Sequence, residues 1–270
     1  MQVIGLCRFS YLGLGGFQIT HDSLDERMAF LYNPDRLEER FRFFETITLP
    51  CIRAQTDPDF TFLIVIGDSF PIAARTRLDQ LVRDIPQVIV QSHPPQRHRR
   101  VMRDAVNSVR WFDADPCLQF RLDDDDAVAI TYVAQLRAAA AHVTGLLDRF
   151  QHVAIDFNQG YIAKPGANGL EIAAIKDPYC TAGLAVLLHP NINKAILNFG
   201  HHKISKIMPT LTFTDQDMML RGHNAFNDSR QKTRSLRMTT FEPITAAEAA
   251  HFRATYNIDA DHVRRVFAHT

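Results

Sequence analysis

The sequence predicts an α/β protein in which a mostly parallel, Rossmann-like sheet continues into a mixed sheet. Up to about residue 157, short apolar runs alternate with segments whose apolar residues recur at helical spacing. This alternation is typical of a parallel sheet covered by helices on both faces. Beyond it, the turn-rich stretch KPGANG joins two β-rich runs and predicts a hairpin over residues 159–175. No linker or repeat divides the chain, so we expect one domain over residues 1–270, with a nucleotide-binding half at about 1–157 and a second half at about 158–270.

Five apolar runs predict the strands of the first half. The run FTFLIVIG is almost continuously apolar, as expected of a strand that is buried on both faces. Another small and apolar segment occupies residues 181–189. The five predicted strands cover residues 2–7, 60–66, 87–90, 117–122 and 152–157.

Between these strands, apolar residues three or four positions apart predict helices. The first helix follows Asn-Pro-Asp, which is a helix-start signal, and places Leu37, Phe41 and Phe44 on one side. A last helix is expected where Asp215 and Asp217 precede an apolar run, and the rest of the C-terminal third looks looser. The five predicted helices cover residues 36–53, 74–83, 99–111, 132–143 and 215–221.

Composition excludes several classes of protein. The 30 Lys+Arg balance the 30 Asp+Glu, and 46% of the residues are apolar, which excludes a disordered charged chain and gives no sign of binding nucleic acid through bulk charge. Cys7, Cys51, Cys117 and Cys180 form no CxxC pair, which predicts buried free thiols in a reducing compartment. The N-terminus lacks a basic signal-peptide region, and no apolar run approaches the roughly 20 residues of a spanning helix. We therefore expect a cytoplasmic protein, while peripheral membrane contact and the oligomeric state stay open.

Four consecutive carboxylates, Asp123 to Asp126, directly follow the predicted strand at residues 117–122. Ligands of open α/β sheets bind beyond the carboxyl ends of the strands, where this quartet is expected to lie. Adjacent carboxylates repel one another unless a cation or hydrogen-bond donors compensate. Mg²⁺ and Mn²⁺ suit such all-oxygen ligands and commonly share them with phosphates. The alternative is a solvated acidic turn or a helix N-terminus.

Arginines precede the quartet in QRHRRVMRDAVNSVR, residues 96–110, and Arg8 ends the first predicted strand. A guanidinium matches phosphate oxygens with two parallel hydrogen bonds, and a helix N-terminus adds a favourable dipole. For any one of these arginines a solvated helix face or a salt bridge is an equally good interpretation. The Gly-rich SYLGLGG lacks both GxGxxG and GxxxxGK[ST], so it gives little support to a dinucleotide or P-loop site.

A strand followed by Asp-x-Asp-Asp resembles the DxD motif of GT-A glycosyltransferases. The segments RFS, PCIRAQTDPDFTFLIVIGD and FRLDDDDA resemble the bacterial rhamnosyltransferase family over most of the chain. The resemblance implies a GT-A-like fold whose second half binds the acceptor. It also implies that Asp123 faces a nucleotide sugar and that Asp125, together with Asp123, binds a divalent cation, Mn²⁺ or Mg²⁺. Whether Asp124 or Asp126 joins them stays open.

The resemblance extends to supporting residues. MRDAVN loosely resembles the Arg-Asn helix that lies beside the base in GT-A enzymes, which makes Arg100, Arg103 and Asn107 candidates for donor binding. His223 in LRGHNAFND is the candidate for completing the metal shell, with His201 and His202 as competitors. If the enzyme inverts configuration, Asp217 or Asp215 is the candidate general base, and Asp156 is a weaker one. Together, the candidates for binding the substrate are Arg8, Arg100, Arg103, Asn107, Asp123 and Asp124.

The function predicted from these residues is metal-dependent transfer of a sugar, rhamnosyl by resemblance. The donor would be a nucleotide-diphosphate sugar such as dTDP-rhamnose, and the acceptor a glycan or another hydroxyl compound. A metal-dependent phosphohydrolase is the rival, although two-metal hydrolases use ligands from several strand ends. A non-catalytic module that binds nucleotides or anionic sugars is the third alternative.

Overall fold

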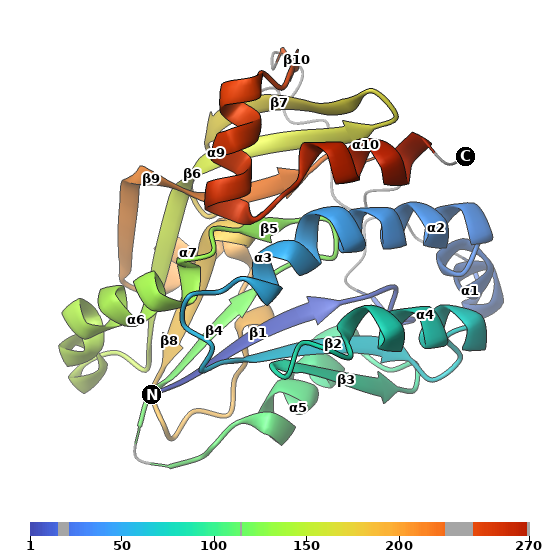
Figure 1. Ribbon diagram of the computed structural model, residues 1–270. Coiled ribbons are helices and arrows are strands. Elements are labelled where there is room, and N and C mark those ends of the chain that lie inside the picture. The colour runs from blue at the N-terminus through green and yellow to red at the C-terminus, as the bar shows by residue number, and fades with distance from the viewer. Residues whose placement is uncertain (16–21, 114, 225–239, 269–270) are drawn as a thin grey trace.

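The computed structural model describes residues 1–15, 22–113, 115–224 and 240–268 (Figure 1). Its main sheet has the strand order β10-β7-β6-β8-β4-β1-β2-β3, and β9 pairs with both β5 and β6. The strands are β1 (Gln2–Arg8), β2 (Thr61–Gly67), β3 (Val88–His93), β4 (Cys117–Arg121), β5 (Ala127–Val128), β6 (His152–Gly166), β7 (Gly169–Lys176), β8 (Leu184–Leu188), β9 (Thr210–Gly222) and β10 (Glu242–Pro243). The α-helices are α1 (Leu24–Leu31), α2 (Pro34–Phe43), α3 (Leu49–Arg53), α4 (Ile72–Val82), α5 (His98–Val109), α6 (Tyr132–Val143), α7 (Ile204–Ile207), α9 (Ala246–Tyr256) and α10 (Ala260–Ala268).

Strand directions confirm the predicted α/β class. Strands β3, β2, β1 and β4 are parallel, whereas β8 runs antiparallel to both of its neighbours, β4 and β6. The predicted hairpin is β6 and β7, which turn between Gly166 and Gly169. Strand β6 continues across residue 157, so a mostly parallel half and a mixed half share one sheet. This arrangement is the one that the sequence predicts.

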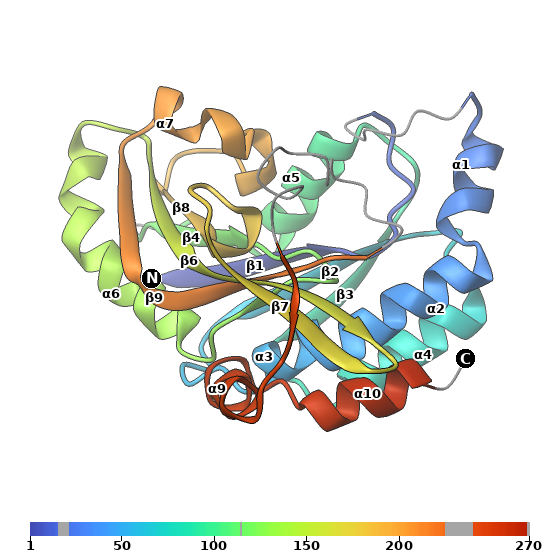
Figure 2. The ribbon, with the colours of Figure 1, turned by 90° about the horizontal axis from the view of Figure 1, so that it is seen from above.

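Side chains of β1 alternate between the two faces of the sheet, because successive strand residues point in opposite directions. Ile4 and Leu6 pack with Val101 and Met102 of α5 on one face. On the other face, Cys7 belongs to the larger apolar core that also includes residues of α2, α3 and α4. Figure 2 shows α5 on one side of the sheet and α2, α3 and α4 on the other. Helices therefore cover both faces of the sheet around β1.

Helix α2 begins where the sequence predicts a helix. The Asn33 side chain caps it by accepting hydrogen bonds from the backbone N–H groups of Asp35 and Arg36, and Pro34 occupies its first position. A π-helical turn, η1 (Phe44–Thr48), joins α2 directly to α3, so one helical segment reaches Arg53. Arg36 and Arg40 are both buried, although most Arg residues in proteins are exposed. Helix α2 thus directs charged side chains into the interior.

The helix predicted at residues 215–221 is wrong, because these residues belong to strand β9. Met218, Met219 and Leu220 are buried, and β9 pairs with β5 on one side and β6 on the other. Pairing on both sides outweighs the local helical spacing. The supposedly looser C-terminal third contains α9 and α10, and α9 starts with a capping box between Thr245 and Glu248. None of the helices within the described ranges is long and apolar enough to cross a membrane.

Candidate active site

The four carboxylates form the turn between β4 and β5, at the carboxyl edge of the parallel strands. Asp124, Asp125 and Asp126 are only 1%, 2% and 6% exposed. The Asp126 N–H donates to the Asp123 carbonyl at 3.1 Å, and the Gly222 N–H donates to the Asp126 carboxylate at 3.0 Å. The solvated acidic turn is therefore the wrong interpretation of this motif. Its burial demands compensating charge.

Arg40 of α2 supplies part of that charge. Its Nε donates to Asp124 Oδ2 at 2.8 Å, and its Nη2 pairs with Asp124 Oδ1. Its Nη1 lies 3.3 Å from Asp125 Oδ2, which also accepts a 2.7 Å hydrogen bond from Asn224 Nδ2. One buried guanidinium therefore holds two neighbouring carboxylates, and a forked contact of this kind fixes orientation as well as charge.

Arg121, the last residue of β4, pairs with Asp123. Its Nε and Nη2 donate to the two carboxylate oxygens at 3.1 and 2.6 Å. Burial alone would raise the pKa of Asp123, but the charges of Arg121, Arg8 and Arg40 hold that pKa below its usual range. Asp123 is therefore ionised at neutral pH.

Asp125 and Asp126 behave in the opposite way. Burial raises the pKa of Asp125, and the nearby Asp123 charge raises it further, although Arg40 opposes the change. Burial followed by the charges of Asp125 and Asp123 holds the pKa of Asp126 well above its usual range. These two carboxylates therefore lie where additional positive charge would be favourable.

Arg8 lies beside the quartet, as expected from the end of β1. Its Nη1 donates to His98 Nε2 at 3.1 Å, and His98 is the first residue of α5. Burial, then the charges of Arg8 and Arg121, lower the pKa of His98 to about 3, so this ring is neutral. The N-terminal end of α5 therefore lies next to Arg8 at the carboxyl edge of the sheet.

The other donor-binding candidates of α5 are not brought to the quartet. Arg100 and Arg103 both pair with Asp104, at 3.7 and 2.7 Å. Asn107 lies further along the helix and donates to the side chain of Asn193. These contacts favour the solvated-face interpretation for Arg100 and Arg103.

The structure does not place His223 as a ligand. Its backbone N–H donates to the Ala163 carbonyl at 2.8 Å, and its ring packs against Phe241 with the centroids 5.4 Å apart. Its neighbours in the chain, Gly222 and Asn224, make the contacts to the quartet instead. In the part of the chain that the structure describes, no group of three or more His, Cys, Asp or Glu side chains is arranged to hold a metal ion.

Asp217 is also distant from the quartet. It lies on β9 and is held by Gln159 Nε2 at 2.9 Å, Tyr161 Oη at 3.3 Å and His251 Nε2 at 3.0 Å. It lies five positions before Gly222 on the strand, which is roughly 16 Å at the usual rise per residue. Asp215 is exposed and lies further along the same strand. The structure does not bring either residue together with Asp123 and Asp125.

Sequence reasoning missed Arg40, Arg121, His98 and Asn224. Arg121 had a local signal, since it stands two residues before Asp123 in FRLDDDD. Arg40 and Asn224 are 84 and 99 positions from the carboxylates that they contact, and no spacing rule connects them.

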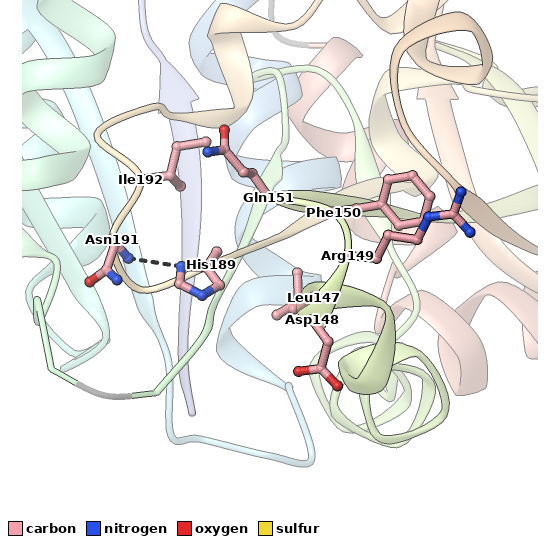
Figure 3. Close-up of a pocket in the computed structure, with 8 residues that line it drawn as sticks. All are labelled: Leu147, Asp148, Arg149, Phe150, Gln151, His189, Asn191 and Ile192. Carbon is pink, nitrogen blue, oxygen red and sulfur yellow. Dashed lines mark hydrogen bonds between the residues drawn. The ribbon is translucent and has the colours of Figure 1, made fainter.

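A pocket of about 290 Å³ lies elsewhere, at the amino edge of β4 (Figure 3). The His189 N–H donates to the Gln151 carbonyl there, and the Asn191 N–H donates to His189 Nδ1 at 3.2 Å. Since β4 starts beside this pocket and ends at the quartet, the two places are at opposite edges of the sheet.

The family comparison shows a glycosyltransferase, and the acidic motif of this chain lies at the carboxyl edge of the parallel strands. Residues 2–236 match the family described as "Putative rhamnosyl transferase", and the chain belongs to that family. Comparison with curated proteins found no match.

Among solved structures, the chain is similar to S. aureus TarS. It is 10% identical to TarS 1-349 with a TM-score of 0.42, and the match covers 82% of this chain and 60% of that one. TarS 1-349 in complex with UDP-GlcNAc is 9% identical with a TM-score of 0.43, and the match covers 99% of this chain and 71% of that one.

Proposed function

We propose that the protein transfers a glycosyl residue from a nucleotide-diphosphate sugar to a hydroxyl acceptor, with the donor diphosphate bound at the quartet. The observation that carries this proposal is the buried Asp123–Asp126 turn, which lies between Arg40, Arg121 and Arg8 at the carboxyl edge of the sheet. A diphosphate needs cationic groups and N–H donors close together. The family supports rhamnose as the transferred sugar, and dTDP-rhamnose is accordingly the proposed donor.

A divalent cation, Mn²⁺ or Mg²⁺, fits the chemistry of this site. The donor set is carboxylate oxygen, and Asp125 and Asp126 have pKa values that burial and mutual repulsion raise. Asp123 and Asp125 would hold the cation, with Asn224 beside Asp125 in the position that the sequence suggested for His223. When bound, the cation would neutralise the charge that grows on the leaving nucleoside diphosphate.

The protein's own residues have distinct parts in this proposal. Arg40 keeps Asp124 and Asp125 in place, and Arg121 orients Asp123. Arg8, held by the neutral ring of His98, points its charge toward the same edge and stabilises the negative diphosphate. The acceptor is proposed to be a glycan or another compound with a free hydroxyl group.

Nucleotide binding with and without metal tests the proposal. Isothermal titration with dTDP and with UDP, each in Mn²⁺ and in EDTA, should show binding of at least one nucleotide that strengthens with Mn²⁺. Asp125→Asn should remove the metal dependence, whereas Asp148→Asn, at the opposite edge of the sheet, should bind as the wild type does. Failure of both nucleotides to bind would contradict the proposal. Turnover of p-nitrophenyl phosphate would favour the phosphohydrolase instead.

A further inference from the structure

His201, which the sequence suggested as a competitor of His223 for the metal shell, lies at the same edge of the sheet as the quartet. His201 begins the short helical turn His201–Lys203, and its Nδ1 lies 3.0 Å from the carbonyl oxygen of Tyr179. A carbonyl only accepts hydrogen bonds, so Nδ1 carries the proton and Nε2 keeps a lone pair. Tyr179 has a φ of 62°, a left-handed conformation that is unusual for a bulky residue. Such conformations cluster at functional sites, where the surrounding structure maintains them.

The pairing of β4 with β8 relates His201 to the quartet. Phe120 of β4 lies opposite Ala185 of β8 in an antiparallel pair, so the residues that precede Leu184 continue past the carboxyl end of β4, where the quartet begins. The charges of Arg121 and Arg221 also act on the His201 ring. Arg121 is the residue that pairs with Asp123, and Arg221 precedes Gly222, whose N–H holds Asp126. Cys180 follows Tyr179, and burial raises the pKa of its thiol, with the charge of Asp126 raising it further. The segment from Tyr179 to Cys180, and the His201 ring bonded to it, therefore lie at the same edge of the sheet as the acidic turn.

The same surroundings keep His201 uncharged. Partial burial of the ring lowers the pKa of His201 most, the Tyr179 carbonyl opposes this effect, and Arg121, His202 and Arg221 lower the pKa further. A neutral imidazole with a fixed tautomer is a competent proton acceptor at neutral pH. Its exposure leaves the ring accessible to an acceptor.

We infer that His201 is the general base of the proposed transfer and that it takes the proton of the acceptor hydroxyl on Nε2. As the O–H bond breaks, the hydroxyl oxygen forms a bond to the anomeric carbon of the donor sugar. The bond from that carbon to the phosphate oxygen breaks, and its electron pair leaves with the nucleoside diphosphate. The inference rests on the proposed function, and it assigns to His201 the role that the sequence suggested for Asp217, which lies elsewhere on β9.

Donor hydrolysis tests this assignment, because a base that activates an acceptor hydroxyl also activates water. The measurement is the release of dTDP from dTDP-rhamnose and of UDP from UDP-GlcNAc, each with Mn²⁺. His201→Gln should lower kcat about 10²–10⁴-fold, the range typical of a lost general base, and leave the affinity for the nucleoside diphosphate unchanged. His142→Gln, at an exposed position of α6, is the matched control and should keep wild-type kcat. Imidazole added to His201→Ala should restore part of the rate, which loss of a merely structural residue would not allow.

Three results would overturn the assignment in distinguishable ways. Wild-type kcat in His201→Gln would show that another group takes the proton. Loss of nucleotide affinity together with kcat in that variant would assign His201 to donor binding. A wild-type protein that releases neither nucleotide would overturn the proposed function itself, and the role of His201 with it.

Discussion

Arg40 links two parts of the chain that are far apart in sequence, since it reaches from α2 to carboxylates more than 80 positions away. The side chains of Arg40, Asp124 and Asp125 are 8%, 2% and 3% exposed, so water screens these charges very little. Attraction between buried charges roughly offsets the cost of burying them, but removing one partner leaves the other uncompensated. The stability of the site thus depends on keeping every member of this group.

We predict that Arg40→Met lowers the free energy of unfolding by about 3–5 kcal/mol, the usual cost of breaking a buried ion pair. Urea unfolding at neutral pH measures the change. Arg42→Met is the matched control on the same helix, where the lost partner is the half-exposed Glu38, and it should cost less than about 1 kcal/mol. Adding Asp124→Asn to Arg40→Met should recover stability. A double variant weaker than the single one would contradict this account.

Asp156 of β6 is a fully buried carboxyl group. Its Oδ1 accepts a hydrogen bond from the Tyr179 N–H at 3.1 Å, whereas its Oδ2 has no hydrogen-bond partner among the described residues. Burial raises the pKa of Asp156 to about 6, and the hydrogen bond from the Tyr179 N–H only partly opposes it. Ionisation of this group therefore destabilises the folded state.

Because the folded pKa lies above the unfolded one, Asp156 favours the folded state at low pH and loses this effect as pH rises from about 4 to about 6. We predict that Asp156→Asn, which keeps the oxygen for the Tyr179 N–H, is more stable than wild type at pH 8 by up to about 3 kcal/mol. The difference should nearly vanish at pH 4. Urea unfolding at the two pH values measures it, and an equal difference at both would show that ionisation is not its cause.

At the scale of elements, β9 and the acidic turn come into van der Waals contact at Gly222. A Cβ atom added to Gly222 would stand 2.1 Å from the carbonyl oxygen of Asp125. Backbone on both sides prevents an easy adjustment, so any side chain there must push β9 away from the turn. The close approach also allows the Gly222 N–H to reach Asp126 and Asn224 to reach Asp125.

We predict that Gly222→Ala destabilises the fold by about 1–3 kcal/mol, the usual cost of overpacking a well-packed site, and weakens nucleotide binding. Thermal unfolding and titration with dTDP or UDP measure the two effects. Gly145→Ala is the control, since a Cβ there meets nothing within 4 Å, and it should leave both quantities unchanged. Unaltered binding in Gly222→Ala would mean that the turn tolerates displacement of β9.

Elements whose pattern is local were predictable from the sequence. Most strands and helices up to α6 follow apolar periodicity and cap residues, such as Asn33 and Pro34 at the start of α2, whereas the short elements α1 and β5 were not predicted. Strand β9 was not predictable, because its pairing with β5 and β6 overrides a helix-like spacing. The acidic turn was predictable from its four consecutive carboxylates. Arg40 and Asn224 were not, because only the tertiary structure brings them to the turn.

At the scale of the whole molecule, the C-terminal helices complete the core. Phe252, Tyr256, Ile258 and Val263 are fully buried, and all lie beyond residue 236, where the family match ends. Tyr256 Oη donates to the Met219 carbonyl of β9, and Asn257 Nδ2 donates to the Pro50 carbonyl of α3. Helices α9 and α10 thus tie the second half of the chain to the first (Figure 1).

We predict that a chain ending at residue 240 does not fold cooperatively. Each of the four buried side chains contributes about 1.5–3 kcal/mol, and their sum is comparable with the whole stability of a typical domain. A chain ending at residue 268 keeps both helices and serves as the control. Circular dichroism during heating should show a sharp transition for the control alone, and a sharp transition in the shorter chain would contradict the prediction.

All four cysteines are buried as free thiols, as the sequence predicted. Burial raises the pKa of Cys51 to about 12 and of Cys117 to about 11, so the reactive thiolate is scarce in the folded state. Cys7 lies in the apolar core next to the acidic turn. Cys180 directly follows Tyr179, whose carbonyl oxygen accepts the hydrogen bond from His201. A thiol reagent can therefore react with a cysteine only when the chain around it opens. The rate at which each cysteine is alkylated measures how often that part of the protein unfolds locally.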